Sequence, residues 1–259
     1  MKVAAVQLNI EWENKQANYA KVANLLDRAQ IQPNSLIVLP EMFSTGFSMN
    51  VSEICENESN ETGRFLQNMA RKHRSFVLGG MVEKQPDGRG RNEAAVVDPA
   101  GGEIARYAKM HPFSFAGETG HYAPGDGITL FHWNRFAVAP FICYDLRFPE
   151  IFRHAAQQGA TLFAVIACWP QGREAHWMKL LQARAIENQA YVVGVNRCGR
   201  DPKLAYSGRS AIIDPKGNVL VDAGNDEGII SAELDWSALD AYRREFPALA
   251  DIRPEYRWE

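Results

Sequence analysis

The chain has 259 residues, a length that suits one large α/β domain about as well as two small ones. Hydrophobic residues make up 46% and charged residues 23%, and the formal net charge is −3, so the composition favours neither a nucleic-acid partner nor a membrane surface. No apolar run reaches the length of a transmembrane helix, and the apolar start of the chain is too short for a secretory signal. These features predict a soluble globular protein.

The cysteines bear on metal binding and on the cellular compartment. Cys55, Cys143, Cys168 and Cys198 are widely spaced, with no C-x-x-C pair and no histidine at a metal-ligand interval. This pattern predicts neither a disulfide framework nor a zinc site, and it indicates a reducing, cytoplasmic compartment.

The N-terminal part of the chain alternates apolar runs with segments whose apolar residues recur at helical spacing. The expected elements are a strand over 3–8, a helix over 18–30, a strand over 35–41, a helix over 62–74 and a strand over 75–83. The acidic segment 50–61 is expected as a surface loop that opens into the second helix. These elements therefore predict a βαβ arrangement in the N-terminal part of the chain.

Two later segments have the same pattern: each contains an apolar strand, a D-P-x-G turn and a second strand. They cover residues 92–109 and 208–224 and predict two hairpins in matching positions. Between them the sequence predicts a strand over 136–145, a helix over 149–158, a strand over 160–170, a helix over 174–189 and a strand over 190–196.

This order of elements favours two mixed sheets packed together with helices on their outer faces, a four-layer α-β-β-α sandwich. A single doubly wound sheet is the rival, but it accommodates the two hairpins poorly. No low-complexity linker divides the chain, so residues 1–259 are expected to form one domain. A C-terminal arm is expected from about residue 235, and its residues 242–259 are expected to be irregular and to pack on this subunit or on a partner.

Three polar residues lie where predicted strands end, namely Glu41, Lys109 and Cys143. Taken singly, a buried small thiol, a loop carboxylate and a solvated lysine are the better interpretations. Strand ends are where α/β proteins assemble active sites, however, and together the three supply a nucleophile, a general base and a cation for an oxyanion. That set is the equipment for acyl transfer.

The segments "LPEMF", "YAKMHPF" and "ICYDLRFPE" occur in this order and resemble the three signature segments of the nitrilase (carbon-nitrogen hydrolase) superfamily. The resemblance spans nearly the whole chain. It implies the four-layer sandwich, no cofactor, a homodimer, and a catalytic triad of Glu41, Lys109 and Cys143. It also implies a role for Glu118 in "FSFAGETGHYAPG", where a solvent-facing loop carboxylate is the alternative.

Within the superfamily, the segment from "ACWPQGR" to "VVGVNRCG" resembles the ω-amidase branch, whose substrates are amides of 2-oxo dicarboxylic acids such as 2-oxoglutaramate or 2-oxosuccinamate. The resemblance makes Phe43 and Trp169 walls of the pocket and Arg173 the partner of the substrate carboxylate. The alternatives are a core aromatic for Trp169 and a solvated residue at a helix start for Arg173.

The expected reaction releases ammonia from a primary amide through a thioester on Cys143, with the oxyanion held by Lys109 and the main-chain N–H of Tyr144. The alternative enzyme is a nitrile hydrolase or an N-carbamoyl amino acid hydrolase, because the chemistry of the triad would be the same and only the substrate pocket would differ. A non-catalytic scaffold of the same fold is the alternative of another class. Arg147, Phe148 and Glu150 are assigned to packing or to a subunit interface.

Overall fold

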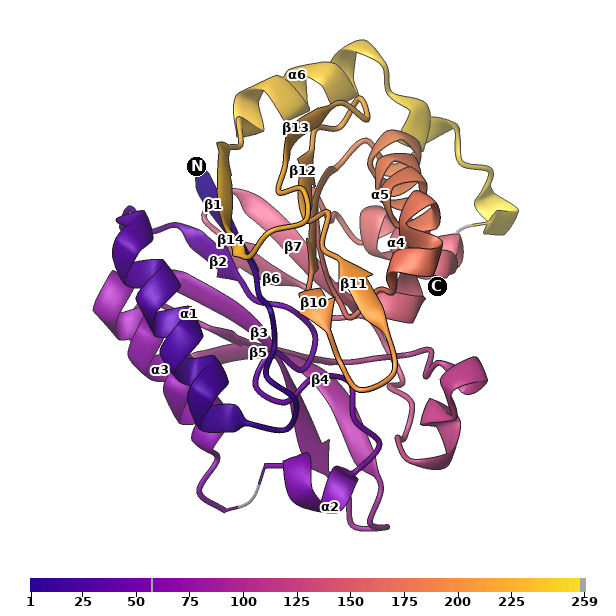
Figure 1. Ribbon diagram of the computed structural model, residues 1–259. Coiled ribbons are helices and arrows are strands. Elements are labelled where there is room, and N and C mark those ends of the chain that lie inside the picture. The colour runs from indigo at the N-terminus through magenta and orange to yellow at the C-terminus, as the bar shows by residue number, and fades with distance from the viewer. Residues whose placement is uncertain (57, 257–259) are drawn as a thin grey trace.

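The computed structural model describes residues 1–56 and 58–256 and contains two six-stranded mixed sheets packed face to face (Figure 1). The first sheet consists, in spatial order, of β14 (Gly228–Glu233), β1 (Lys2–Gln7), β2 (Leu36–Val38), β3 (Phe76–Lys84), β4 (Gly90–Val97) and β5 (Glu103–Ala108). The second consists of β13 (Val219–Asp222), β12 (Ala211–Ile213), β9 (Tyr191–Asn196), β8 (Leu162–Ala167), β7 (Phe136–Ile142) and β6 (Phe131–Trp133).

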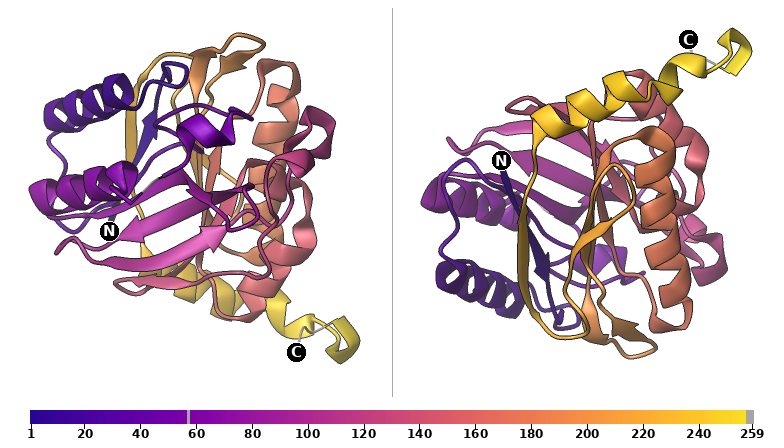
Figure 2. Two further views of the ribbon diagram at one scale, coloured as in Figure 1. Left: turned by 90° about the horizontal axis from the view of Figure 1, so that it is seen from below. Right: turned by 90° about the horizontal axis from the view of Figure 1, so that it is seen from above.

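Helices cover the outer face of each sheet, as Figures 1 and 2 show from three sides. The first sheet is covered by α1 (Lys15–Ala29) and α3 (Glu61–His73), and the second by α4 (Pro149–Gln157) and α5 (Glu174–Asn188). The predicted four-layer α-β-β-α sandwich is confirmed. Within the described ranges, no helix combines the length and the apolar character needed to cross a bilayer.

The alternation of side chains along the strands builds two separate parts of the core. In β2, Leu36 and Val38 pack with the second sheet, whereas Ile37 packs with the helices of the outer layer. Successive side chains of a strand point to opposite faces, so a fully apolar strand serves both layers at once. This explains why the sequence shows continuous apolar runs instead of alternation.

The two predicted hairpins are confirmed as β4–β5 and β12–β13, and each lies at the edge of its sheet. The same turn chemistry forms both. Asp98 and Asp214 accept main-chain N–H groups within their turns, and Gly101 and Gly217 each adopt a φ of 85°. A positive φ favours glycine, which accounts for the repeated D-P-x-G pattern.

The first and last strands of the sandwich lie side by side. β14 pairs antiparallel with β1 along its whole length, from Lys2 opposite Glu233 to Gln7 opposite Gly228. The first sheet therefore contains residues from both ends of the fold.

Two segments differ from the expected surface structure. The segment 50–61 contains a short helix, α2 (Val51–Ile54), because Val51 and Ile54 are buried against Met42, Val82 and Tyr122; position 57 of this segment lies outside the described residues. A small hairpin of β10 (Cys198–Arg200) and β11 (Ala205–Ser207) was also not expected, since neither strand carries an apolar run.

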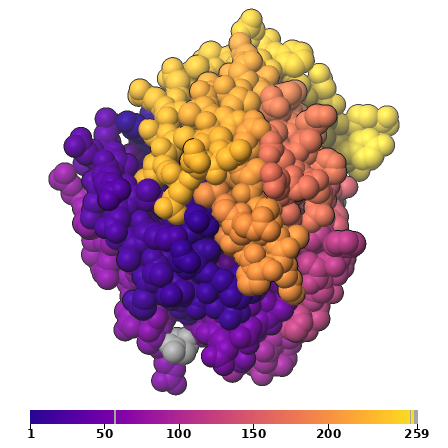
Figure 3. Space-filling view, viewed as in Figure 1, coloured from indigo at the N-terminus to yellow at the C-terminus, as the bar shows by residue number. Residues whose placement is uncertain are grey.

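The C-terminal arm begins as a helix, and residues 242–245 of the segment expected to be irregular belong to it. α6 (Trp236–Glu245) starts where the Asp235 side chain accepts the N–H groups of the first turn, and Leu239 is buried. Beyond α6 the chain forms two short 3-10 turns and protrudes from the body of the molecule (Figure 3), where Gln157 donates a hydrogen bond to the Tyr256 carbonyl. Residues 257–259 of the expected arm lie outside the described residues.

Candidate active site

The sandwich brings together the four side chains that the sequence nominated for catalysis. Glu41 lies just beyond β2, Lys109 directly follows β5, and Cys143 directly follows β7 of the other sheet. Glu118 begins a 3-10 turn in the loop after Lys109. The candidate site therefore lies between the two sheets, at strand ends.

Lys109 lies between the two carboxylates. Its Nζ is 3.0 Å from Glu41 Oε1 and 2.8 Å from Glu118 Oε2, and all three side chains are buried. Glu118 is thus a buried partner of the lysine, and the alternative of a solvent-facing loop carboxylate is wrong. Burying three charges is favourable only when each is paired and hydrogen-bonded, as these are.

A fifth residue, Asn92 of β4, completes this cluster and was not identified from the sequence. Its Nδ2 donates to Glu41 Oε1 (2.7 Å) and to Glu118 Oε1 (3.1 Å). The second oxygen of Glu41 accepts the main-chain N–H of Cys168 at 2.7 Å. Both Glu41 oxygens are therefore held, which fixes the carboxylate in one orientation.

The charges of the cluster act on both the amine and the thiol. Burial acts to lower the pKa of Lys109, but the Glu118 and Glu41 carboxylates outweigh it and raise this pKa well above its usual value. Burial also raises the pKa of the Cys143 thiol, and the negative charge of Glu41 raises it further. Lys109 is therefore an ammonium, and Cys143 is a thiol until a base takes its proton.

Cys143 lies in a sharp turn of the main chain. It begins a 3-10 helix directly after β7 and adopts a φ of 49°, a left-handed conformation that is uncommon for residues other than glycine. Such backbone strain persists only where the surroundings impose it, and it occurs frequently at functional sites. Here the turn presents the side chain at the end of the strand.

Asp145 ties this turn to the loop that follows Lys109. It is fully buried, and its carboxylate accepts hydrogen bonds from the Tyr107 hydroxyl (2.8 Å) and from the main-chain N–H of His111 (3.0 Å). The segment carrying Cys143 and the segment carrying Lys109 are thereby fixed to each other. No motif in the sequence indicated this role.

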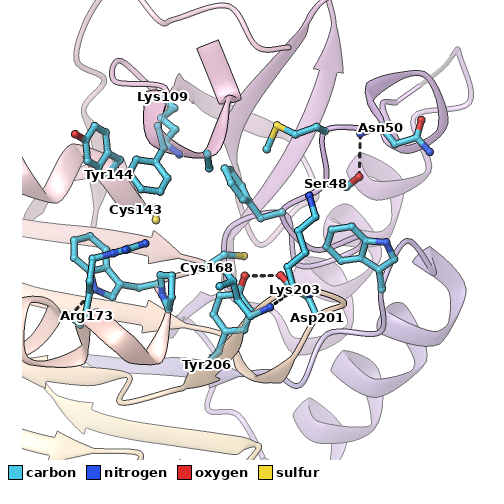
Figure 4. A pocket seen from close by; sticks show the side chains of 18 of the residues that line it. Ser48, Asn50, Lys109, Cys143, Tyr144, Cys168, Arg173, Asp201, Lys203 and Tyr206 are labelled. Carbon is cyan, nitrogen blue, oxygen red and sulfur yellow. Dashed lines mark hydrogen bonds between the residues drawn. The ribbon is translucent and has the colours of Figure 1, made fainter. Parts of the chain in front are cut away.

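A cavity of about 320 Å³ opens in front of Cys143 (Figure 4). Three of the four side chains that were predicted to bind substrate line it, namely Tyr144, Trp169 and Arg173. Trp169 is nearly buried, and its indole N–H donates to the Arg173 carbonyl at 2.8 Å. Trp169 therefore both closes the wall and fixes the start of α5.

Phe43 does not line the cavity. It is fully buried in the outer core, with its ring centroid 6.1 Å from that of Tyr19 and 5.9 Å from that of Phe65. Phe47 lies at the cavity instead, and its ring centroid is 5.1 Å from the Lys109 ammonium. The expected position of Phe43 is wrong because the chain turns directly after β2.

The cavity wall carries positive charge that is not neutralised by neighbouring carboxylates. Arg147 and Arg173 both line it, and neither takes part in a salt bridge among the residues that the structure describes. Arg147 lies with its guanidinium carbon 4.8 Å from the centroid of the Trp169 ring, although the sequence had assigned it to packing or an interface. The arrangement suits an anionic ligand.

Comparison with known proteins agrees with this geometry. The omega-amidase YafV of Yersinia enterocolitica is 40% identical over 97% of this chain and 96% of its own length. A 2-oxoglutaramate amidase of Bacillus subtilis is 32% identical over 98% of each chain. A crystal structure of a CN-hydrolase superfamily protein from Xanthomonas campestris has a TM-score of 0.92 at 30% identity and covers 98% of this chain and 97% of its own.

The profile of one protein family, described as carbon-nitrogen hydrolase, matches residues 2–244. That match includes all three signature segments and both sheets. The protein belongs to the carbon-nitrogen hydrolase family.

Proposed function

We propose that the protein is an ω-amidase that hydrolyses the primary amide of a 2-oxo dicarboxylic acid, 2-oxoglutaramate or 2-oxosuccinamate, to the acid and ammonia. The relatives named omega-amidase and 2-oxoglutaramate amidase support the substrate class. The observation that carries the proposal is the pairing, within one small cavity, of the Cys143 thiol with the unneutralised guanidinium of Arg173. A short substrate with an amide at one end and a carboxylate at the other fits this pair.

The reaction begins with proton transfer from Cys143 to Glu41. Lys109, Glu41 and Glu118 together carry one net negative charge in a buried site. Releasing the thiol proton to solvent would add a second buried negative charge, whereas transfer to Glu41 leaves the total unchanged. Glu41 is therefore the general base: it is neutral while it holds the thiol proton and becomes a carboxylate again when that proton passes on.

Attack of the thiolate on the amide carbonyl gives a tetrahedral intermediate, whose oxyanion is held by Lys109 and the main-chain N–H of Tyr144. Collapse breaks the carbon–nitrogen bond, and the proton on Glu41 passes to the nitrogen, so that ammonia leaves. Water activated by Glu41 then hydrolyses the thioester and releases the acid. Glu118, which bonds Lys109 directly, keeps the ammonium in place.

An ammonia-release screen tests the substrate class. The purified protein is assayed with 2-oxoglutaramate, 2-oxosuccinamate, simple aliphatic amides, nitriles and N-carbamoyl amino acids at equal concentration. We expect the two 2-oxo amides to give the highest kcat/KM. A preference for nitriles or carbamoyl amino acids would contradict the proposal, and no ammonia from any compound would favour a non-catalytic scaffold.

Removing the Arg173 guanidinium should weaken the use of substrates that carry a carboxylate. For Arg173→Ala we expect kcat/KM for 2-oxoglutaramate to fall roughly ten- to a hundredfold, as a charge-assisted pair of about 1.5 to 3 kcal/mol is lost. A simple amide without the distal carboxylate is the control, since a folding defect would depress both substrates equally. Equal losses, or none, would remove Arg173 from the binding site.

We also propose that the protein is a homodimer in a reducing, cytoplasmic compartment. Large apolar side chains are exposed on α5, on β13 and after α6, namely Ile186, Leu220 and Phe246. A second copy that covered these side chains would remove them from water. All four cysteines are free thiols, which suits reducing conditions. Sedimentation as a monomer at micromolar concentration would contradict the dimer.

A further inference from the structure

A buried asparagine, Asn196, forms hydrogen bonds with the chain just beyond β8. It is the last residue of β9 and lies opposite Ala167, the last residue of β8, in the parallel pair. Its Oδ1 accepts the main-chain N–H of Trp169 at 2.7 Å, and its Nδ2 donates to the Trp169 carbonyl at 3.0 Å. The side-chain amide therefore pairs with Trp169 as a neighbouring strand would, and it extends the pairing past the end of β8.

The remaining hydrogen of this amide holds a third segment. Nδ2 also donates to the Gly208 carbonyl at 2.8 Å, and Gly208 follows β11, whose Tyr206 lines the cavity. The oxygen must face the Trp169 N–H and the nitrogen must face the two carbonyls, so the partners fix the orientation of the amide. Asn196 is only 1% exposed, and loss of its side chain would leave buried main-chain groups without partners.

The residue before Trp169 holds the general base. The main-chain N–H of Cys168 donates to Glu41 Oε2 at 2.7 Å, and the Cys168 thiol lies 3.3 Å from the Glu41 carbonyl oxygen. Cys168 lies beyond the last paired residue of β8, so its main chain is fixed between that residue and the hydrogen bonds at Trp169. The direction of the Cys168 N–H, and with it that of the Glu41 carboxylate, therefore depends on Asn196.

Trp169 itself contacts the two arginines of the cavity wall. The guanidinium carbon of Arg147 lies 4.8 Å from the centroid of the Trp169 ring, and the indole N–H donates to the Arg173 carbonyl at 2.8 Å. A shift of the Trp169 main chain would move the ring that contacts one arginine and the donor that holds the main chain of the other. The place of both guanidinium groups therefore also depends on the bonds at Trp169.

We propose that Asn196 is a positioning residue of the active site. Through the main chain beyond β8 it sets the orientation of the Glu41 carboxylate and the place of the arginines that bind the substrate carboxylate. Asn196 is not one of the residues that line the cavity, so it acts through them. The part that concerns the arginines rests on the proposed function, whereas the part that concerns Glu41 can be tested without a substrate.

Two variants remove different parts of this contact. Asn196→Ala removes all three hydrogen bonds. Asn196→Asp has nearly the same shape and keeps an oxygen for the Trp169 N–H, but it presents a second oxygen to the Trp169 and Gly208 carbonyls and so loses both donated bonds. The aspartate variant is the milder one, and it serves where the alanine variant folds poorly.

Asn18 of α1 provides a matched control, because it makes the same three bonds in another part of the fold. It is fully buried, its Oδ1 accepts the main-chain N–H of Glu11, and its Nδ2 donates to the carbonyls of Glu11 and Ser44, each at 2.8 Å. These bonds join the loop before α1 to the turn after β2, and not the segment that carries Trp169.

Alkylation by iodoacetamide tests the effect on Glu41. Peptide mass spectrometry gives the rate at Cys143 relative to the rate at Cys55, a partly exposed thiol at the end of α2 that is the internal reference. We expect this rate ratio to fall about three- to tenfold in both Asn196 variants, because Glu41 is less well placed to take the thiol proton. A merely structural loss would loosen the site and accelerate alkylation of Cys143, so the direction of the change separates the two explanations.

Two amides that differ at one end test the effect on the arginines. Glutaramate, the monoamide of glutaric acid, carries a carboxylate where pentanamide carries a methyl group. We expect the ratio of their kcat/KM values to fall about three- to tenfold in both Asn196 variants and to keep its wild-type value in Asn18→Ala. Because each ratio compares two substrates on one protein, a loss of folded enzyme cancels.

The inference is wrong if either ratio is unchanged in both Asn196 variants, or if Asn18→Ala lowers the substrate ratio as much as Asn196→Ala does. A wild-type enzyme that releases no ammonia from any amide would instead count against the proposed function. The alkylation ratio would still decide whether Asn196 positions Glu41.

Discussion

Cys143→Ala is expected to abolish amide hydrolysis, with kcat lower by a factor on the order of 10⁴ or more, because no other group at the site forms the thioester. The fold should be retained, since removing one small side chain at this site lowers the free energy of unfolding by only about 1 kcal/mol. Ammonia release and a urea unfolding curve measure the two effects.

Cys168→Ala is the matched control for Cys143→Ala, because Cys168 lines the same cavity. The bond to the Glu41 carboxylate uses the main-chain N–H of Cys168, which alanine keeps, and only the bond from the thiol to the Glu41 carbonyl is lost, so this variant should remain active. Mass spectrometry after rapid quenching with substrate should find the acyl group on the peptide that contains Cys143. An adduct on any other cysteine would contradict the assignment of the nucleophile.

Glu41→Gln should nearly eliminate acylation, with kcat lower by a factor of about 10² to 10⁴, as expected when a general base is lost. Glutamine has nearly the same shape, but it cannot take the Cys143 proton, and it brings an amide toward the Lys109 ammonium. Single-turnover formation of the acyl-enzyme measures the first half-reaction directly. Turnover of Glu41→Gln at the wild-type rate would exclude this mechanism.

The variant Glu118→Gln distinguishes the positioning of Lys109 from the transfer of the Cys143 proton. This variant should also be severely impaired, because Glu118 holds Lys109, but Glu41 remains to ionise the thiol. Alkylation of Cys143 by iodoacetamide should therefore continue in Glu118→Gln and be strongly slowed in Glu41→Gln. Equal alkylation rates in the two variants would show that the carboxylates do not have distinct roles.

The sequence predicted the layers of the fold well, because buried strands and amphipathic helices leave clear apolar patterns and the D-P-x-G turns are chemically specific. It predicted less where tertiary contacts decide the structure. The helix α2 forms because Val51 and Ile54 find a buried surface, and the β10–β11 hairpin has no apolar strand to reveal it. Both segments belong to loops in the sequence pattern.

The candidate site could likewise be predicted only in part. Glu41, Lys109 and Cys143 follow strands and lie in recognisable motifs, so they could be nominated from the sequence. Asn92 lies within a strand, where a single polar residue gives no sign that it joins two carboxylates of distant segments. Such contacts depend on how β4 lies in the sheet relative to β2, with β3 between them, and no local sequence pattern encodes that arrangement.

The pairing of β14 with β1 has a consequence for synthesis on the ribosome. β1 is synthesised well before β14, its neighbour on one side, which is completed only at Glu233, so the nascent chain carries an unpaired edge on an apolar strand while the residues between them are made. Glu41 and Lys109 both follow strands of that sheet. We therefore expect hydrolytic activity to arise only after β14 has been made, and a fragment that stops before Gly228 to retain an open sheet edge that favours aggregation.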